Sequence, residues 1–227
     1  MIWIYGDSWG CKAQEEKPST LVWPKLVRNS LRDTTKNYSL GGTSIEWSLF
    51  NIQKTKQEWA EGDTLLFSEQ MLINKWFFKD NPRLSGPGGI SRSGKLSDED
   101  KNYCFKWFTE IYNEELEHFH LQAHYCQLNS WLVEKNMNGY VLQGYPRPHI
   151  DNFSNLFMSK GKTFVEISDN EWVHLPENFR FQFDKRPGHL SEVNHYNIAR
   201  QVVKAIKSNS SVDLTCSFAE GFYSLDN

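Results

Sequence analysis

A run of four apolar residues that ends in a polar turn constrains the fold more than any other feature. Residues 2–5 (Ile-Trp-Ile-Tyr) are all β-branched or aromatic, which is typical of a buried strand. Gly6, Asp7 and Ser8 interrupt the run at once. Open α/β folds bind their ligands at the carboxyl ends of the strands. Ser8 is therefore either a nucleophile at the end of the first strand or an ordinary turn residue, and this stretch alone favours the turn.

Length and charge exclude several classes of protein. A chain of 227 residues suits one large domain with a substantial core. The net charge of −3 argues against a protein that mainly binds the nucleic-acid backbone. Neither a signal peptide nor an apolar run long enough to span a membrane is visible, so we expect a cytoplasmic protein, or a virion-associated one if the source is viral. The scattered cysteines predict reduced thiols rather than disulfides: Cys11, Cys104, Cys126 and Cys216.

Strand and helix patterns alternate along the chain. The apolar runs predict strands at 2–5, near 37, at 64–67, at 140–143 and at 163–167. The 3.6-residue patterns predict helices at 20–31, from 45 onward, over 97–135 (ended by Asn138-Gly139) and over 192–207. Such alternation predicts an α/β fold, a three-layer sandwich with a central parallel sheet.

The domain organisation follows from the same patterns. We expect one domain over residues 1–208, in which residues 79–136 form a loop and helical insertion. Residues 209–227 form a polar C-terminal tail without periodicity, which is either disordered or draped over the domain. In the terminal helix, Val193, Ile198 and Val202 are expected on the apolar face.

Two further segments are predicted to reach the same edge of the sheet as Ser8. Gly41-Gly42 enters a helix that Ser44 caps, and backbone N–H groups in such a turn suit an oxyanion, although this stretch alone favours a plain tight turn that needs glycine. His189 directly precedes the last helix, for which Ser191 is the expected N-cap. Catalysis by serine needs a nearby base and oxyanion donors, which Ser8, His189 and the Gly42 N–H group would supply.

No cofactor is expected from the sequence. His120 and His124 have the i, i+4 spacing that can hold a metal, but no acidic residue completes a recognised pattern. We therefore interpret both as ordinary helix residues and predict no metal site.

The three segments together resemble the SGNH (GDSL-like) hydrolases. Ile4-Tyr-Gly-Asp-Ser8 is similar to the first block of that family, Asn37-Tyr-Ser-Leu-Gly-Gly-Thr-Ser44 to the second, and His189-Leu-Ser-Glu-Val-Asn-His195 to the last. The resemblance implies a flavodoxin-like fold and a serine esterase. It makes Ser8 the nucleophile, His189 the base and Gly42 an oxyanion donor.

The sequence departs from the family pattern in two places. The third block usually contains Gly-x-Asn, whose amide is an oxyanion donor, whereas this chain has Phe67-Ser-Glu-Gln-Met-Leu-Ile-Asn74, which leaves Asn74 or Gln70 for that role. The family commonly places Asp three residues before the histidine, and Arg186 stands there instead. Asp184 is the remaining candidate to orient His189; otherwise the site is a Ser–His dyad or is weakened.

Three functions are compatible with these motifs. The leading hypothesis, which rests on the Ser8, Gly42 and His189 segments, is an esterase that removes an acyl or acetyl group from a lipid or carbohydrate. The Trp-rich composition adds only that a carbohydrate substrate is plausible. The second is a catalytically weak protein of the same fold that binds glycan or protein, for example as a viral or cell-surface accessory. The third is a flavodoxin-like binding domain without esterase chemistry, which would need a longer Gly-rich loop after the first strand.

Overall fold

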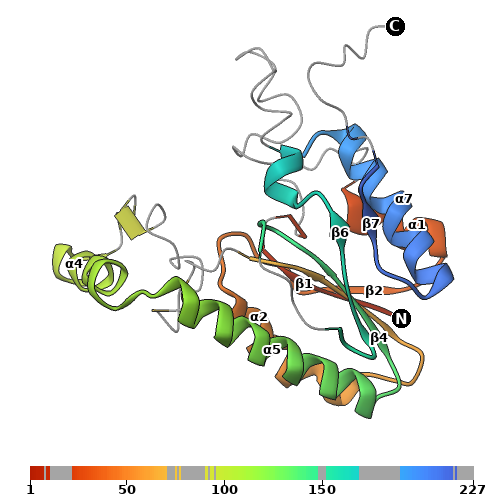
Figure 1. Cartoon of the computed structure of the whole chain (residues 1–227), viewed down its shortest axis with the longest axis horizontal. Coiled ribbons are helices and arrows are strands. Elements are labelled where there is room, and N and C mark those ends of the chain that lie inside the picture. The colour runs from red at the N-terminus through yellow and green to blue at the C-terminus, as the bar shows by residue number, and fades with distance from the viewer. Residues whose placement is uncertain are drawn as a thin grey trace, which may run out of the picture.

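A parallel five-stranded sheet forms the centre of the molecule (Figure 1). The computed structural model describes residues 1–7, 9–10, 22–70, 75, 77, 90–91, 93–94, 96–147, 152–168, 190–216 and 218. The strands are β1 (Ile2–Gly6), β2 (Thr35–Asn37), β3 (Thr64–Ser68), β4 (Asn138–Leu142) and β5 (Leu156–Met158). Their order is β2-β1-β3-β4-β5, which is the strand order of flavodoxin-like folds.

Helices cover both faces of the sheet, which confirms the predicted three-layer α/β architecture. On one face α1 (Trp23–Leu31) packs beside α7 (Glu192–Ser208), and on the other α2 (Ile45–Thr55) lies beside α5 (Glu114–Glu134) (Figure 1). Each layer has its own apolar core. Before the N-terminal end of α5, α4 (Asp98–Lys106) and a π-helical turn, η2 (Trp107–Ile111), extend away from the sheet.

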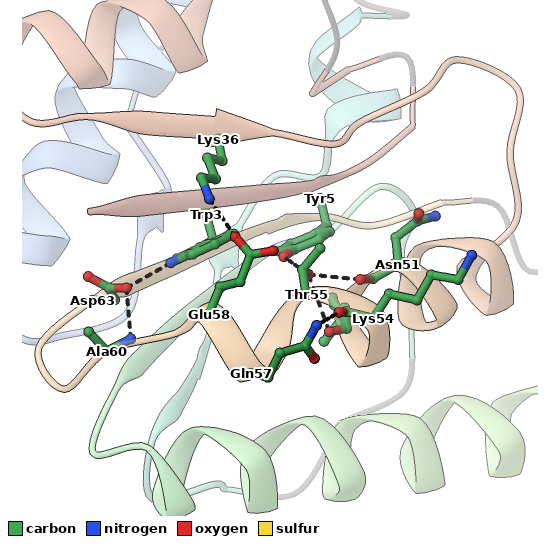
Figure 2. A network of polar contacts seen from close by, with 11 residues as sticks. Trp3, Tyr5, Lys36, Asn51, Lys54, Thr55, Gln57, Glu58, Ala60 and Asp63 are labelled. Carbon is green, nitrogen blue, oxygen red and sulfur yellow. Dashed lines mark hydrogen bonds and ion pairs between the residues drawn. The ribbon is translucent and has the colours of Figure 1, made fainter.

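Polar contacts join β1 to the C-terminal end of α2 and to the turn before β3 (Figure 2). The Tyr5 hydroxyl lies 2.6 Å from Thr55 Oγ1, and the Trp3 indole donates to Asp63 Oδ2 at 2.8 Å. Burial raises the pKa of Tyr5 to about 12, so this phenol stays protonated. The two aromatic side chains of β1 thus satisfy their polar atoms within the core. Tyr5 ties the end of α2 to the sheet, and Trp3 ties β1 to the turn before β3.

The structure confirms most of the predicted elements. Three predicted strands coincide with β1, β3 and β4, and the segment near 37 contains β2. The predicted N-caps are also present: Ser44 accepts a hydrogen bond from the Trp47 N–H group, and Ser191 accepts one from the Asn194 N–H group. The helical region predicted over 97–135 consists of α4, η2 and α5.

Three local predictions are wrong. Residues 164–168 are helical rather than a strand, because Thr163 and Glu166 form a reciprocal capping box, with the Thr163 N–H group 2.7 Å from Glu166 Oε2. Asn138-Gly139 does not end α5 but belongs to β4, and Asn136 takes the left-handed conformation after the helix. Val193 is exposed, since it lies in the first turn of α7 on the side facing solvent.

Part of the predicted C-terminal tail packs on the domain. Asp213–Leu214 forms β7, which pairs with β6 (Lys160–Gly161). Val212, Leu214 and Phe218 are buried in the same core as α1 and α7. For this stretch the draped alternative is therefore correct. None of the described helices combines the length and apolar character that crossing a bilayer requires.

Candidate active site

The strand order reverses direction between β1 and β3, and in such sheets the ligand site lies at the carboxyl ends of these two strands. Gly6, the last residue of β1, pairs with Ser68, the last residue of β3. The backbone φ angle of Gly6 is +146°, and an added Cβ atom on this residue would lie 2.3 Å from the Ser68 carbonyl oxygen. Only glycine permits this approach of the two strand ends.

The residues around position 8 form a buried turn. Asp7 is 5% exposed, and its Oδ1 accepts a hydrogen bond from the Trp9 N–H group at 3.1 Å. The Gly10 N–H group closes the turn on the Asp7 carbonyl at 3.2 Å, while the Ser68 hydroxyl lies 3.5 Å from Asp7 Oδ1. Asp7 therefore holds the turn against the end of β3. Ser8 itself lies outside the described residues.

Asn37, at the end of β2, supports the same turn. Its Nδ2 donates to the Gly10 carbonyl at 2.8 Å, and its Oδ1 accepts from the Ser39 N–H group at 2.9 Å. The asparagine of the second sequence block is thus a structural residue that ties the segment after β2 to the turn after β1.

The Gly-Gly turn leads directly into α2, as predicted. Gly42 is exposed with a φ of +75°, and Ser44, fully buried, caps the helix. The left-handed conformation at Gly42 is one that glycine adopts without strain. The positive φ is by itself sufficient reason for a glycine at position 42, so the role of the Gly42 N–H group as an oxyanion donor stays a prediction.

Two hydrogen bonds connect the turn after β1 to the start of α7. The Trp23 indole donates to the Trp9 carbonyl at 2.7 Å, and the Trp23 N–H group donates to His195 Nδ1 at 3.3 Å. Leu190 belongs to the same buried cluster as Trp9 and Trp23. The neighbours of Ser8 and of His189 in the sequence are therefore held in one part of the core. His189, Asp184, Arg186 and Asn74 lie outside the described residues.

A buried ion pair occupies the segment that follows β3. Arg147 Nε donates to Glu69 Oε2 at 2.9 Å, and the two side chains are 1% and 0% exposed. The Gly144 N–H group donates to the same oxygen at 3.1 Å, and the Tyr125 hydroxyl donates to Oε1. Burial raises the pKa of Glu69, and the Arg147 charge opposes that shift. Sequence reasoning missed this pair, although a charged residue directly after a buried strand was the available signal.

Gln70, one of two candidates for the missing amide donor, is 1% exposed. Its Nε2 donates to the Ser48 hydroxyl on α2, whereas its Oε1 has no hydrogen-bond partner. This amide is therefore already used in part to anchor α2.

Unpaired polar atoms concentrate at this edge of the sheet. Five buried side-chain atoms in the described part of the chain lack a hydrogen-bond partner, and four of them belong to the segments that follow β2, β3 and β4: Ser39 Oγ, Glu46 Oε2, Gln70 Oε1 and Arg147 Nη1. A buried polar atom without a partner costs about 1–3 kcal/mol. Such atoms are rare and call for an explanation, and a ligand is one.

No cluster of three potential ligands for a metal ion occurs within the described ranges. Near His120 and His124, the ammonium group of Lys75 forms ion pairs with Glu46 Oε1 and Glu117 Oε2. Burial lowers the pKa of His124, which favours the neutral ring.

Comparison of the sequence with family models and with curated proteins gives no match to either.

Proposed function

We propose that the protein is a serine hydrolase of the SGNH type that cleaves an acyl or acetyl ester of a lipid or carbohydrate. Two observations support a site at the carboxyl edge of the sheet. The strand order places the switch point between β1 and β3, and the unpaired buried polar atoms gather at that edge. The second observation carries the proposal, because buried polar atoms without a protein partner are rare and their gathering at one edge favours a site that binds a polar ligand there.

In this mechanism Ser8 Oγ attacks the ester carbonyl while His189 accepts its proton. The negative charge that develops on the carbonyl oxygen is stabilised by the N–H groups of Ser8 and Gly42. His189 then protonates the leaving alcohol, which leaves an acyl group on Ser8. In the second half of the reaction His189 takes a proton from a water molecule that attacks the acyl-enzyme, and returns that proton to Ser8 Oγ as the acid is released. Asp184 orients His189, or the pair acts as a dyad.

The hydrogen bonds through Trp23 support this mechanism, because they hold sequence neighbours of Ser8 and His189 in one part of the core. They join Trp9, which follows Ser8, to His195, which lies six residues after His189. Both bonds are buried, so the two chain segments are fixed to one body rather than to separate surface loops.

A second candidate is a catalytically weak binding protein of the same fold. The segment after β3 favours it, because the Gln70 amide is already committed to Ser48, and the neighbouring Glu69 is a carboxylate committed to an ion pair. In this case the edge of the sheet binds a glycan or protein without turning it over.

Substitution of the nucleophile separates the two candidates. The wild type and Ser8→Ala are incubated with short-chain p-nitrophenyl esters and with a fluorophosphonate probe, and labelling is located by peptide mass spectrometry. We expect turnover and a covalent adduct on Ser8 in the wild type and neither in Ser8→Ala. Ser130→Ala, an exposed position on α5, is the matched control and should behave as wild type. Turnover or labelling that persists in Ser8→Ala would refute the esterase mechanism, and absence of both in the wild type would favour the binding protein.

A further inference from the structure

We infer that the Arg147 guanidinium is the side-chain donor to the anionic oxygen of the ligand at this edge of the sheet. In the proposed hydrolase, on which this inference rests, that oxygen is the oxyanion formed when the Ser8 Oγ–carbon bond forms. The guanidinium stays protonated throughout and donates a hydrogen bond only. Arg147 thereby takes the place of the asparagine amide of the Gly-x-Asn pattern, which this chain does not have.

The guanidinium is held in place by two of its three nitrogens. Nε donates to Glu69 Oε2 at 2.9 Å and Nη2 donates to the Gln70 carbonyl at 3.1 Å. The third nitrogen, Nη1, is buried and has no partner. A charged donor that is rigidly oriented and unpaired before the ligand binds is what electrostatic stabilisation of a developing charge requires.

The anchors of Arg147 lie beside the turn that contains position 8. Glu69 and Gln70 directly follow Ser68, which pairs with Gly6 and contacts Asp7. Gly144, which donates to Glu69, is packed so closely that an added Cβ atom would lie 2.4 Å from the Glu69 carbonyl oxygen and 2.9 Å from the Trp9 ring. The ion pair and the turn after β1 are therefore in contact through Gly144.

The other donors to Glu69 explain why Nη1 of Arg147 has no hydrogen-bond partner. The Gly144 N–H group and the Tyr125 hydroxyl both donate to the carboxylate, so its two oxygens are satisfied with a single N–H group from the guanidinium. A second bond from Arg147 to Glu69 is not needed. The fork geometry of the guanidinium leaves Nη1 for another acceptor.

Removal of Arg147 alone would leave a buried carboxylate unpaired, which commonly destabilises a protein by about 3–5 kcal/mol. The test therefore uses Arg147→Lys, which keeps the charge but not the fork, and the double variant Glu69→Gln/Arg147→Gln, which removes both charges. Arg200→Gln, on the exposed surface of α7, is the matched control. Urea midpoints identify the variants that fold.

The first measurement is steady-state hydrolysis of p-nitrophenyl acetate. We expect kcat to fall about 100-fold or more in both Arg147 variants with little change in KM, because the bond forms only in the transition state. Added guanidinium ion should restore part of kcat in the double variant. Turnover that depends on Ser8 but is unchanged in both variants would overturn the inference and leave the proposed function intact.

The second measurement does not need catalysis. Methylphosphonate, a tetrahedral anion, is titrated while the thermal midpoint is followed. We expect a rise in midpoint for the wild type, Ser8→Ala and Arg200→Gln, and no rise for the two Arg147 variants. If no Ser8-dependent turnover exists, an Arg147-dependent rise would refute the hydrolase and retain the anion site. No rise in the wild type would overturn the inference.

Discussion

The hydrogen bond from Trp23 to Trp9 allows a quantitative test of how firmly the turn after β1 is held. Trp23 is fully buried and donates its indole N–H to the Trp9 carbonyl at 2.7 Å. Trp23→Phe removes that donor, and loss of a buried hydrogen bond costs about 1–3 kcal/mol. The smaller ring also leaves a cavity of about 40 Å³, which at about 24 cal/mol per Å³ costs about 1 kcal/mol. We expect the free energy of unfolding to fall by about 2–4 kcal/mol.

Trp59→Phe is the matched control, because Trp59 is only 4% exposed and its indole nitrogen has no hydrogen-bond partner. The same change of ring should cost no more than about 1 kcal/mol there, because the cost of the cavity is offset by removal of a buried N–H group that has no partner. Urea unfolding followed by circular dichroism gives both values. Equal losses in the two variants would show that the Trp23–Trp9 bond does not hold the turn, and would remove the main physical support for joining Ser8 to the start of α7.

Two further predictions concern the sheet. Gly6→Ala should destabilise the protein far more than Gly62→Ala. At Gly6 an added Cβ atom would lie 2.3 Å from the Ser68 carbonyl oxygen, whereas nothing lies within 4 Å of one at Gly62. Equal urea midpoints for the two variants would contradict the close approach of the strand ends. Burial alone would raise the pKa of Asp63, but hydrogen bonds led by the one from the Trp3 indole lower this pKa below its ordinary value of 3.8. The ionised carboxylate therefore stabilises the folded protein above pH 3.8, and this stabilisation is lost as the pH falls through the pKa of the folded state. Asp63→Asn should therefore be less stable than the wild type at pH 6 and lose less stability between pH 4 and 2, as measured by urea unfolding at each pH.

The strands were predictable where burial on both faces gives a continuous apolar run. β1, β3 and β4 all have that character, and their alternation with amphipathic helices was enough to predict the parallel sheet. Helix starts were predictable because the cap is a local interaction: Ser44 and Ser191 each bond to a backbone N–H group within their own first turn.

Two features depend on interactions that a pattern of apolar residues does not contain. Residues 163–167 are mostly apolar and predict a strand, but the side chains of Thr163 and Glu166 pair with backbone N–H groups and begin a helix. The ion pair of Glu69 with Arg147 joins residues 78 positions apart, and its formation depends on the neighbouring ends of β3 and β4. The segment after β3, where the usual Gly-x-Asn pattern of the third block is missing, is thus the one whose structure depends on long-range contacts.

The central place of β1 has a consequence for how the chain folds. β1 comes before every other strand in the chain, yet it lies between β2 and β3, and its longer pairing is with residues 64–68. One edge of β1 can pair with β2 after the first crossover connection, but both edges are paired only after the second crossover brings β3 into place. During synthesis this segment is exposed until β3 has left the ribosome, and parallel pairing of this kind is slow. A delay after residue 68, or a chaperone bound to the first ten residues, would then affect the yield of folded protein more than the same event at the helical insertion.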